Sequence, residues 1–296
     1  MKPKVLVVCG PTATGKSILA VELAKLFDGE IISADSRQVY RGLDIGSAKI
    51  TADEMNGIPH HLIDVANPAD VFTVAEFKKL ADKKITEIIS RGKLPIICGG
   101  TGMYISAVID NTEFPEVPPN EKLRSELEQL TTAELVERLQ KLDPRRVQEI
   151  DTKNPIRLIR AIEIAEALGA VPPSLTTESP YDALCIGLRL PKELLDQRIA
   201  QRVTDRIPAL FDEIRNLLAQ GTLPDRLRKL GLEYRYGTDY VTGKILLPEF
   251  IETLTTKTIQ FAKRQITWWK HDTRVHWMHP ISDKQKILKL VQDFLR

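Results

Sequence analysis

The first third of the chain alternates short apolar runs with longer segments of helical spacing. The apolar runs predict buried strands at Lys4–Cys9, Glu30–Ser33 and Leu94–Cys98. Between them, Ser17–Phe27 and Thr73–Ser90 have the spacing of amphipathic helices, and Thr73 is a suitable helix start. Because strands that alternate with helices are typical of a parallel, doubly wound sheet, we expect an α/β fold with a P-loop NTPase-like core.

The pattern changes in the middle of the chain. His60–Val65 is one more candidate strand, but Glu121–Gly169 has helical spacing throughout and lies between two proline-rich loops. Ala183–Leu190 is again apolar, and we expect it to rejoin the sheet. The sequence therefore predicts an α/β catalytic core of residues 1–114 and 181–296 and a helical insertion domain of residues 115–180.

The C-terminal part returns to the core pattern. Helical spacing covers residues 191–220 and 248–270. Arg274–Met278 is a candidate edge strand, and Lys284–Leu295 is a candidate closing helix. We therefore expect the core to end with one strand and one helix.

Composition and charge exclude few function classes. The 296 residues are 43% hydrophobic and 28% charged, which is ordinary for a globular protein, and a net charge of +2 gives no argument for nucleic-acid binding by the molecule as a whole. Three distant cysteines argue against a disulfide framework and fit a reducing cytosol. His271, His276 and His279 are not spaced with cysteines as in a zinc finger. Without a signal-peptide layout or a long apolar run, we expect a cytoplasmic protein that does not enter a membrane.

Residues 10–17 read GPTATGKS, which fits the phosphate-loop motif of ATP-binding and other nucleotide-binding proteins. Gly10 and Gly15 allow the backbone to approach phosphate oxygens, Lys16 supplies a positive charge, and the Ser17 hydroxyl can hold Mg²⁺. The loop does not specify the reaction, because kinases, GTPases and other pyrophosphate-binding proteins all use it. We expect it to bind a diphosphate through the whole motif, which comprises Gly10, Pro11, Thr12, Ala13, Thr14, Gly15, Lys16 and Ser17.

A carboxylate follows the second predicted strand. Asp35 lies beside the phosphate loop, where the carboxyl ends of parallel strands form the ligand crevice. It could bind Mg²⁺ or act as a general base, or it could only cap a turn, as aspartates often do. The segment alone does not separate these alternatives.

Further motifs give the chain a family resemblance. GPTATGKS is followed in order by DSRQVY, GSAK, PHHLID, GGTGMY, NPIRLIRAIEI and FAKRQITWW. This series resembles the tRNA dimethylallyltransferases (tRNA isopentenyltransferases, the IPP transferase family) and covers about residues 4–278. The resemblance implies transfer of a dimethylallyl group from dimethylallyl diphosphate to N6 of adenosine 37, next to the anticodon of certain tRNAs, with release of diphosphate.

The resemblance also implies roles for individual residues. Asp35 would accept the proton from N6, Thr101 would contact the same amine, and Lys16 and Arg202 would act on the diphosphate with Mg²⁺ as cofactor. We expect a monomer whose partners are dimethylallyl diphosphate and the anticodon arm of tRNA. The tRNA contacts implied by the resemblance are Asp35, Ser36, Arg37, Gln38, Thr101, Arg124, Arg157 and Arg160.

Several of these residues have structural alternatives. Thr101 could cap the following helix. Arg202 could form a surface ion pair with Glu193, Asp196 or Asp205. Arg157 and Arg160 could be solvated charges, although we favour contact with phosphates. Lys263 and Arg264 lie beside Trp268-Trp269 and could bind nucleotides, but we expect at least one of these tryptophans in the core.

The chain departs from the family pattern in its C-terminal third. Arg206, Glu233 and Ile259 stand where the family usually has other residues, which leaves the details of tRNA docking open. Two other activities, one of them from a different class of enzyme, compete with tRNA prenylation. One is adenylate isopentenyl transfer to a free nucleotide, and the other is phosphoryl transfer by a small-molecule kinase with the same loop. A non-catalytic RNA-binding protein is disfavoured by the intact Lys16 and Asp35.

Overall fold

The computed structural model describes residues 2–173 and 176–296. It divides into two compact units, one of residues Met1–Asn111 with Glu178–Arg296 and one of residues Thr112–Thr177. We call them the core and the helical unit. The sequence placed the corresponding boundaries at residues 115 and 180.

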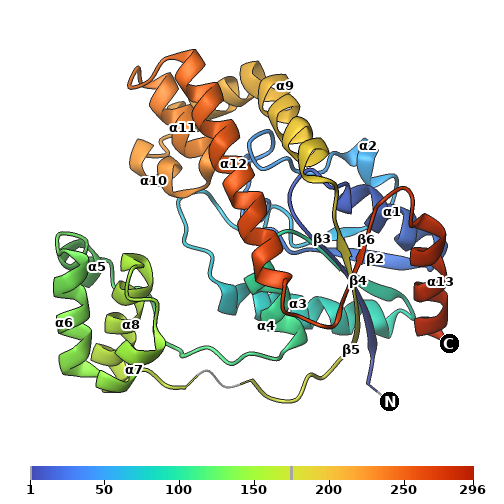
Figure 1. The fold of residues 1–296 in the computed structure, drawn as a ribbon, viewed down its shortest axis with the longest axis horizontal. Helices are drawn as coiled ribbons and strands as arrows, with labels where there is room; N and C mark the ends of the chain where they lie inside the picture. Colours follow the sequence, from blue (N-terminus) through green and yellow to red (C-terminus); the bar gives the residue numbers. More distant parts are fainter. Residues whose placement is uncertain (1, 174–175) are drawn as a thin grey trace. The chain divides into compact units, whose positions relative to one another are not determined.

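The core is built on one six-stranded sheet in which every pairing is parallel (Figure 1). The spatial order is β3-β2-β4-β1-β5-β6, so β6 is an edge strand as predicted. The doubly wound parallel sheet expected from the sequence is therefore confirmed. The strands are β1 (Lys4–Cys9), β2 (Gly29–Ser33), β3 (His60–His61), β4 (Leu94–Cys98), β5 (Asp182–Leu188) and β6 (Val275–Met278).

Helices cover both faces of the sheet because its strands are apolar on both sides. In β1, Val5 and Val7 face one buried cluster, whereas Leu6 and Val8 face another. The first cluster includes residues of α3 (Val74–Ser90) and α4 (Gly102–Ile109), and the second includes residues of α1 (Lys16–Leu26) and α13 (Lys284–Leu295). Successive side chains of one strand point to opposite faces of the sheet, which explains why helices form a layer on each face.

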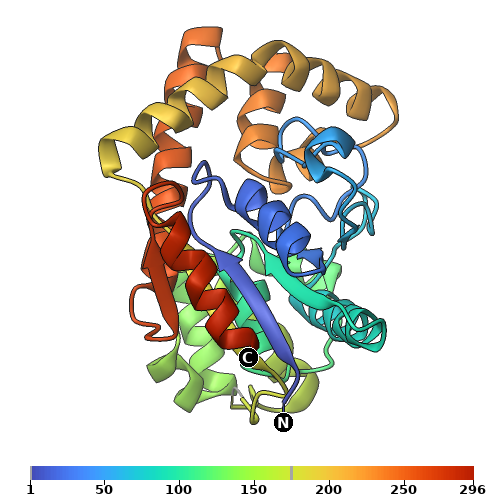
Figure 2. The same cartoon turned by 90° about the vertical axis from the view of Figure 1, so that its right-hand side faces the viewer.

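Four helices gather beyond the carboxyl ends of the strands, as both views of the ribbon show (Figures 1 and 2). The segments expected to be helical at 191–220 and 248–270 form α9 and α12. No helix was predicted between them, yet two short ones form there. The bounds are α9 (Lys192–Ala219), α10 (Pro224–Lys229), α11 (Leu232–Val241) and α12 (Leu247–Trp269).

One predicted strand is much shorter than expected. His60–Val65 was predicted to be extended, but only His60 and His61 pair with β2. Leu62 and Asp64 have φ values of 62° and 56°, which turn the backbone away from the strand direction. The chain before β3 contains the single-turn helix α2 (Ala52–Met55), which begins with a capping box at Thr51.

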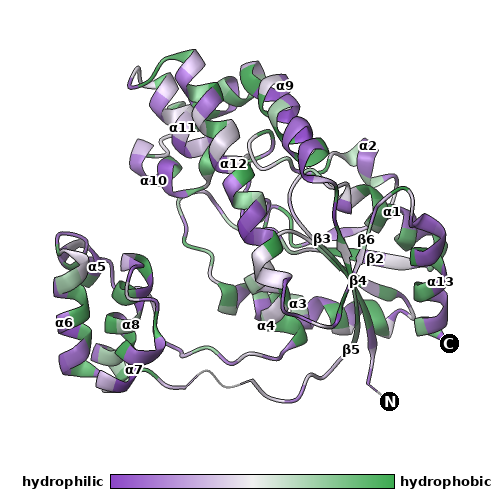
Figure 3. Ribbon diagram, viewed as in Figure 1, coloured by the Kyte–Doolittle hydropathy of each residue, from purple (hydrophilic) through white to green (hydrophobic). Residues whose placement is uncertain are grey.

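The helical unit has its own buried core, which includes Leu127, Leu135, Leu158 and Ile162. In Figure 3, hydrophobic colour follows β4 and β5 in the core and alternates with hydrophilic colour along the helices, including those of this unit. Each unit thus buries apolar side chains of its own. The helices of the unit are α5 (Glu121–Leu127), α6 (Thr132–Leu142), α7 (Pro144–Glu149) and α8 (Pro155–Leu168).

Candidate active site

The phosphate loop joins β1 to α1, as the sequence predicted. Gly10 has a φ of 133°, and a Cβ atom there would lie 2.5 Å from the carbonyl oxygen of Leu188, so only glycine fits. Gly15 has a φ of 90° and directly precedes α1. No acidic side chain lies in the first turn of α1, which leaves the positive end of the helix open to an anion.

Lys16 is folded over this loop. Its ammonium group donates to the carbonyl oxygen of Pro11 at 2.7 Å. Burial lowers the pKa of Lys16, and the nearby charge of Asp35 acts in the opposite direction. A buried ammonium with few partners favours a ligand of opposite charge.

Two arginines of α9 line the same region. Arg202 donates from Nη1 to the hydroxyl of Thr12 at 3.1 Å. Burial lowers the pKa of Arg202 to about 10, and Arg206 contributes to this effect. Within residues 2–173 and 176–296 no carboxylate forms an ion pair with Arg202. Asp196 pairs with Lys192 instead, and Asp205 accepts a hydrogen bond from Gln201. The surface ion pair considered for Arg202 is therefore wrong.

Asp35 follows β2 and closes a turn. Its Oδ1 accepts hydrogen bonds from the backbone N–H groups of Arg37 at 2.8 Å and Gln38 at 3.3 Å. The carboxylate also lines a pocket with Lys16. The turn cap suggested by the sequence is thus present together with access to the pocket, and one role does not exclude the other.

Thr101 stands at the N-cap position of α4, but its side chain does not cap that helix. Its hydroxyl accepts a hydrogen bond from the backbone N–H of Ser36 at 3.0 Å instead. The capping alternative is therefore wrong, and the reason is that Ser36 competes for the hydroxyl. This bond connects the segment after β4 with the segment after β2 at the carboxyl edge of the sheet.

Two adjoining pockets occupy this edge of the sheet. They have Thr12, Lys16, Asp35, Ser47 and Gly100 in common, and their volumes are about 200 and 350 Å³. Together they fall within the roughly 300–1,000 Å³ typical of small-molecule sites. We call them the phosphate pocket and the outer pocket. Site residues predicted from the sequence that line one or both are Thr12, Ala13, Gly15, Lys16, Ser17, Asp35, Ser36, Arg37, Gln38, Thr101 and Arg202.

Other pocket residues were not assigned from the sequence. Glu233 lines the outer pocket, and burial raises the pKa of its carboxyl group. Thr258, which is buried, also lines it, and its hydroxyl has no hydrogen-bond partner among the described residues. Arg228, Lys229 and Arg235 add positive charge to the outer pocket, beside the predicted Arg37 and Arg264. The basic run RLRK at residues 226–229 was a signal in the sequence that could have indicated Arg228 and Lys229.

The predicted tRNA contacts of the helical unit differ from one another. Arg124 forms a two-pronged ion pair with Glu163 at 2.8 and 2.9 Å, and Arg160 binds Glu163 and the carbonyl of Val117. Glu163 itself is buried. Arg157 is exposed, and among the described residues its side chain has no ion-pair partner. None of these three arginines is among the residues that line the two pockets.

The tryptophan pair at the end of α12 is split between core and surface. Trp269 is 1% exposed, which confirms the expectation that at least one of the pair is structural. Trp268 is 44% exposed and donates from Nε1 to the hydroxyl of Ser106. The indole of Trp268 also covers Gly102 at the start of α4. Trp268 is therefore the member of the pair with surface left for a ligand.

Cysteine and histidine chemistry contributes little to this site. Cys9, Cys98 and Cys185 are buried and free, and burial raises the pKa of Cys98 to about 12. In the described part of the chain, no cluster of three or more histidine, cysteine or acidic side chains could hold a metal ion. The thiols and imidazoles therefore offer no separate metal centre.

A phosphate loop at the carboxyl edge of a parallel sheet, with a carboxylate and two arginines beside it, defines an α/β enzyme that acts on a phosphorylated ligand. The model of the family described as IPP transferase matches residues 38–272. The chain belongs to this family, and it is a prenyltransferase of the tRNA dimethylallyltransferase type.

Individual relatives match over nearly the whole chain. The tRNA dimethylallyltransferase of Exiguobacterium sp. is 45% identical, with 94% of this chain and 90% of that protein covered. The corresponding protein of Halalkalibacterium halodurans is 40% identical, with 98% and 96% covered.

Solved structures agree with the sequence matches. The tRNA isopentenylpyrophosphate transferase from Bacillus halodurans has a TM-score of 0.74 at 40% identity, with 99% of this chain and 96% of that chain covered. A eukaryotic dimethylallyltransferase acting on tRNA has a TM-score of 0.80 at 26% identity, with 99% and 79% covered.

Proposed function

We propose that this protein transfers the dimethylallyl group of dimethylallyl diphosphate to N6 of adenosine 37 in tRNA. The observation that carries the proposal is the shared wall of the two pockets, where Lys16 and Asp35 face both. The phosphate pocket is suited to a diphosphate, and the outer pocket is suited to a nucleoside. Donor and acceptor would thus meet at the residues that the pockets have in common.

The donor half uses the phosphate loop as an anion site. The positive end of α1, Lys16 and Arg202 would hold the diphosphate, and they would stabilise the charge that grows on it as the C–O bond breaks. The family resemblance and the placement of these groups around one pocket support this role. These positively charged groups are already in place before the reaction, so they need not rearrange as negative charge grows on the diphosphate. They therefore stabilise the transition state more than the bound substrate.

The site also fits Mg²⁺. The Ser17 hydroxyl and the carboxylate of Asp35 line the phosphate pocket, and hydroxyl, carboxylate and phosphate oxygens are the ligands that this ion prefers. The ion usually binds through one or two protein groups and substrate phosphates, which agrees with the absence of a larger acidic cluster among the described residues. Ser17 would hold it next to the diphosphate, where its charge would assist departure of the leaving group.

The acceptor half uses the segment after β2. N6 of the adenosine would attack C1 of the dimethylallyl group while the C–O bond breaks, and the electron pair of that bond would leave with the diphosphate. Asp35 would take the proton that N6 loses, and Thr101, held by Ser36, would help to place the amine. The adenosine must leave the base stack to enter the outer pocket, as in other base-modifying enzymes.

The tRNA would be held by basic groups on both units. Arg228, Arg235 and Arg264 surround the outer pocket and could contact phosphates on either side of the extruded base. In the helical unit, Arg157 is the exposed candidate for a further phosphate contact. No helix in the described residues is long and apolar enough to cross a membrane, and the cytoplasmic location and the monomeric state remain expectations.

Incubation with labelled dimethylallyl diphosphate tests the proposal. We expect label in unmodified tRNA that has adenosine at position 37, and no label in AMP. Lys16→Ala should reduce transfer by about 10²–10³-fold, because a charged donor to the leaving group is lost. Label that appears only in AMP, or transfer by the variant at the rate of the unchanged enzyme, would contradict the proposal.

A further inference from the structure

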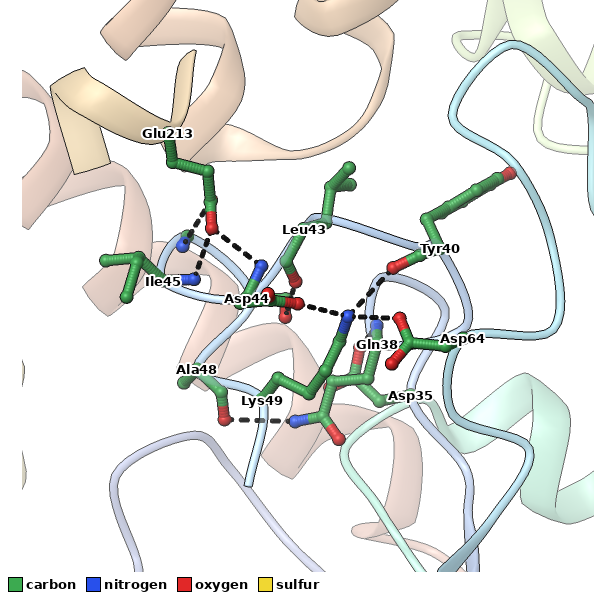
Figure 4. Close-up of polar contacts among 12 residues, drawn as sticks. Asp35, Gln38, Tyr40, Leu43, Asp44, Ile45, Ala48, Lys49, Asp64 and Glu213 are labelled. Atoms are coloured by element: carbon green, nitrogen blue, oxygen red, sulfur yellow. Dashed lines mark hydrogen bonds and ion pairs between the residues drawn. The ribbon is translucent and has the colours of Figure 1, made fainter. Parts of the chain in front are cut away.

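The loop of residues 43–49 is held by a carboxylate from a distant helix. Glu213 of α9 accepts hydrogen bonds from three consecutive backbone N–H groups, those of Asp44 at 2.8 Å, Ile45 at 2.7 Å and Gly46 at 3.1 Å (Figure 4). Consecutive N–H groups that converge in this way form an anion-binding concavity, and here the anion is the protein's own side chain. The contact joins residues 167 or more positions apart in the chain.

A fourth donor completes the shell of this carboxylate. The hydroxyl of Tyr234 in α11 donates to Oε1 of Glu213 at 2.7 Å. Burial and the charge of Glu213 raise the pKa of Tyr234 well above its ordinary value, so the hydroxyl keeps its proton. The ring of Tyr234 also lies against Gly46, where a Cβ atom would come within 2.5 Å of Cζ. The loop, α9 and α11 thus meet at one carboxylate.

The far end of the loop is fixed by a second charge. The ammonium of Lys49 lies between the carboxylates of Asp44 and Asp64 and the carbonyl of Tyr40, at 2.5, 2.6 and 2.9 Å (Figure 4). The Lys49 side chain is only 7% exposed. Lys49 of the GSAK motif and Asp64 of the PHHLID motif therefore hold the loop, and neither residue lines the two pockets.

The held loop forms one wall of the site. Gly46, Ser47 and Ala48 all line one or both pockets. The carbonyl of Ala48 also accepts from the Gln38 side chain at 3.1 Å, and the backbone N–H of Gln38 donates to the Asp35 carboxylate. A chain of contacts therefore leads from the loop to the proposed base.

The helix that carries Glu213 also carries the arginines of the phosphate pocket. Arg206 and Arg202 precede Glu213 by 7 and 11 residues. At 3.6 residues per turn, these spacings place all three side chains on one face of α9. The same helix can therefore hold the diphosphate at one point and the loop at another.

We infer that Glu213 is a positioning residue for prenyl transfer, which fixes the wall of residues 46–48 and, through Gln38, the Asp35 carboxylate relative to Arg202 and Arg206. The inference rests on the proposed function and deepens it. Glu213 touches neither substrate in this scheme. It acts by holding the residues that bind the adenosine at a fixed position relative to the residues that bind the diphosphate.

Glu213→Gln is the sharpest test, because glutamine has the same shape. Its amide nitrogen cannot accept, so either the pair of bonds to Asp44 and Ile45 or the pair to Gly46 and Tyr234 is lost. We expect kcat at saturating tRNA to fall by about 100-fold, as a shift of about 1 Å at a reaction centre can produce. KM for dimethylallyl diphosphate should stay unchanged, since the phosphate loop and Arg202 are not altered.

Asp212→Asn provides the matched control. Asp212 is the next residue on α9, is exposed, and pairs only with Arg215 in the described structure. This variant removes the same charge from the same helix, and its kcat should equal that of the unchanged enzyme. Melting curves of both variants are measured first, so that the assays can be run at a temperature at which both are fully folded.

The proposed function and the positioning role of Glu213 would be contradicted by different results. If the unchanged enzyme does not label tRNA, the proposed function fails. If it does and folded Glu213→Gln matches Asp212→Asn in kcat, the inference is overturned, even when the melting temperature falls. Should Glu213→Gln not fold, Tyr234→Phe removes a single bond from the shell. A kcat lowered severalfold in that variant supports the inference, and an unchanged kcat overturns it.

Discussion

Asp35 combines a structural and a proposed chemical role in one carboxylate. Its Oδ1 caps the turn through Arg37 and Gln38, while the group lines both pockets. The turn cap needs only an acceptor oxygen, whereas proton removal from N6 needs a base. This difference makes the two roles separable by a single substitution.

Asp35→Asn should fold normally and lose most prenyl transfer. The amide oxygen can still accept both backbone hydrogen bonds, so the melting temperature should hardly change. The amide cannot take up a proton, so single-turnover transfer should slow by about 10²–10⁴-fold. A series of Mg²⁺ concentrations is the control, since recovery of the rate at high Mg²⁺ would identify Asp35 as a metal ligand instead of a base.

Lys16 and Arg202 should determine the alkaline side of the pH profile. Burial lowers the pKa of both groups, that of Arg202 to about 10. A cation with a lowered pKa is charged below that value and loses its charge as pH rises through it. We therefore expect kcat/KM for dimethylallyl diphosphate to fall at a pH below the ordinary lysine range of about 10.4. In Lys16→Ala the contribution of Lys16 to this limb should be lost, which leaves the fall that follows the pKa of Arg202, about 10. A profile unchanged by the substitution would contradict the assignment.

At the scale of elements, α8 contains two arginines with opposite structural settings. Arg160 and the neighbouring Arg124 of α5 share the buried carboxylate of Glu163, but Arg157 is exposed. Loss of Arg124 would leave that carboxylate partly unpaired. Loss of Arg157 would remove only a surface charge. Spacing of i and i+3 alone could not distinguish these settings, because both arginines lie on roughly the same side of the helix.

We expect Arg157→Ala and Arg124→Ala to have different effects. Arg157→Ala should weaken tRNA binding and make its salt dependence shallower by about one unit of slope, without a change in stability. Arg124→Ala should lower the free energy of unfolding by about 1–3 kcal/mol, because Glu163 loses two of its hydrogen bonds. Filter binding over a salt series and urea unfolding measure the two effects. An unchanged salt slope in Arg157→Ala would return this residue to a solvated role.

The sequence predicted long elements better than short ones. Apolar strands such as Lys4–Cys9 and long helices with clear starts such as α3 were found, because periodicity is strong in both. The six-residue α10 and ten-residue α11 were missed, since short polar helices depend on tertiary contacts more than on pattern. These helices contribute Glu233 and several cations to the outer pocket, so that half of the site could not be predicted.

The whole molecule contains a helical unit inserted between two strands of the sheet. Its ends are near each other, because Thr112 and Thr176 form an antiparallel bridge. Each unit buries its own apolar cluster. A unit with close ends and its own core can often be removed without loss of the domain that contains it. The chemistry assigned to the pockets lies wholly on the core, whereas Arg157 lies on the helical unit.

Replacement of residues 112–177 by a short glycine-rich linker should therefore leave diphosphate binding unchanged but weaken tRNA binding. The phosphate loop, Arg202 and the hydrogen bonds of Glu213 all lie in the core, so binding of pyrophosphate with Mg²⁺ should keep its affinity in calorimetry. Affinity for tRNA should fall and its salt slope should become shallower, because the phosphate contacts proposed for the helical unit are lost. Prenyl transfer at subsaturating tRNA should fall with it. A melting curve identifies any loss of folding in the shortened core. A folded core that binds and modifies tRNA as well as the full chain would remove the helical unit from substrate recognition.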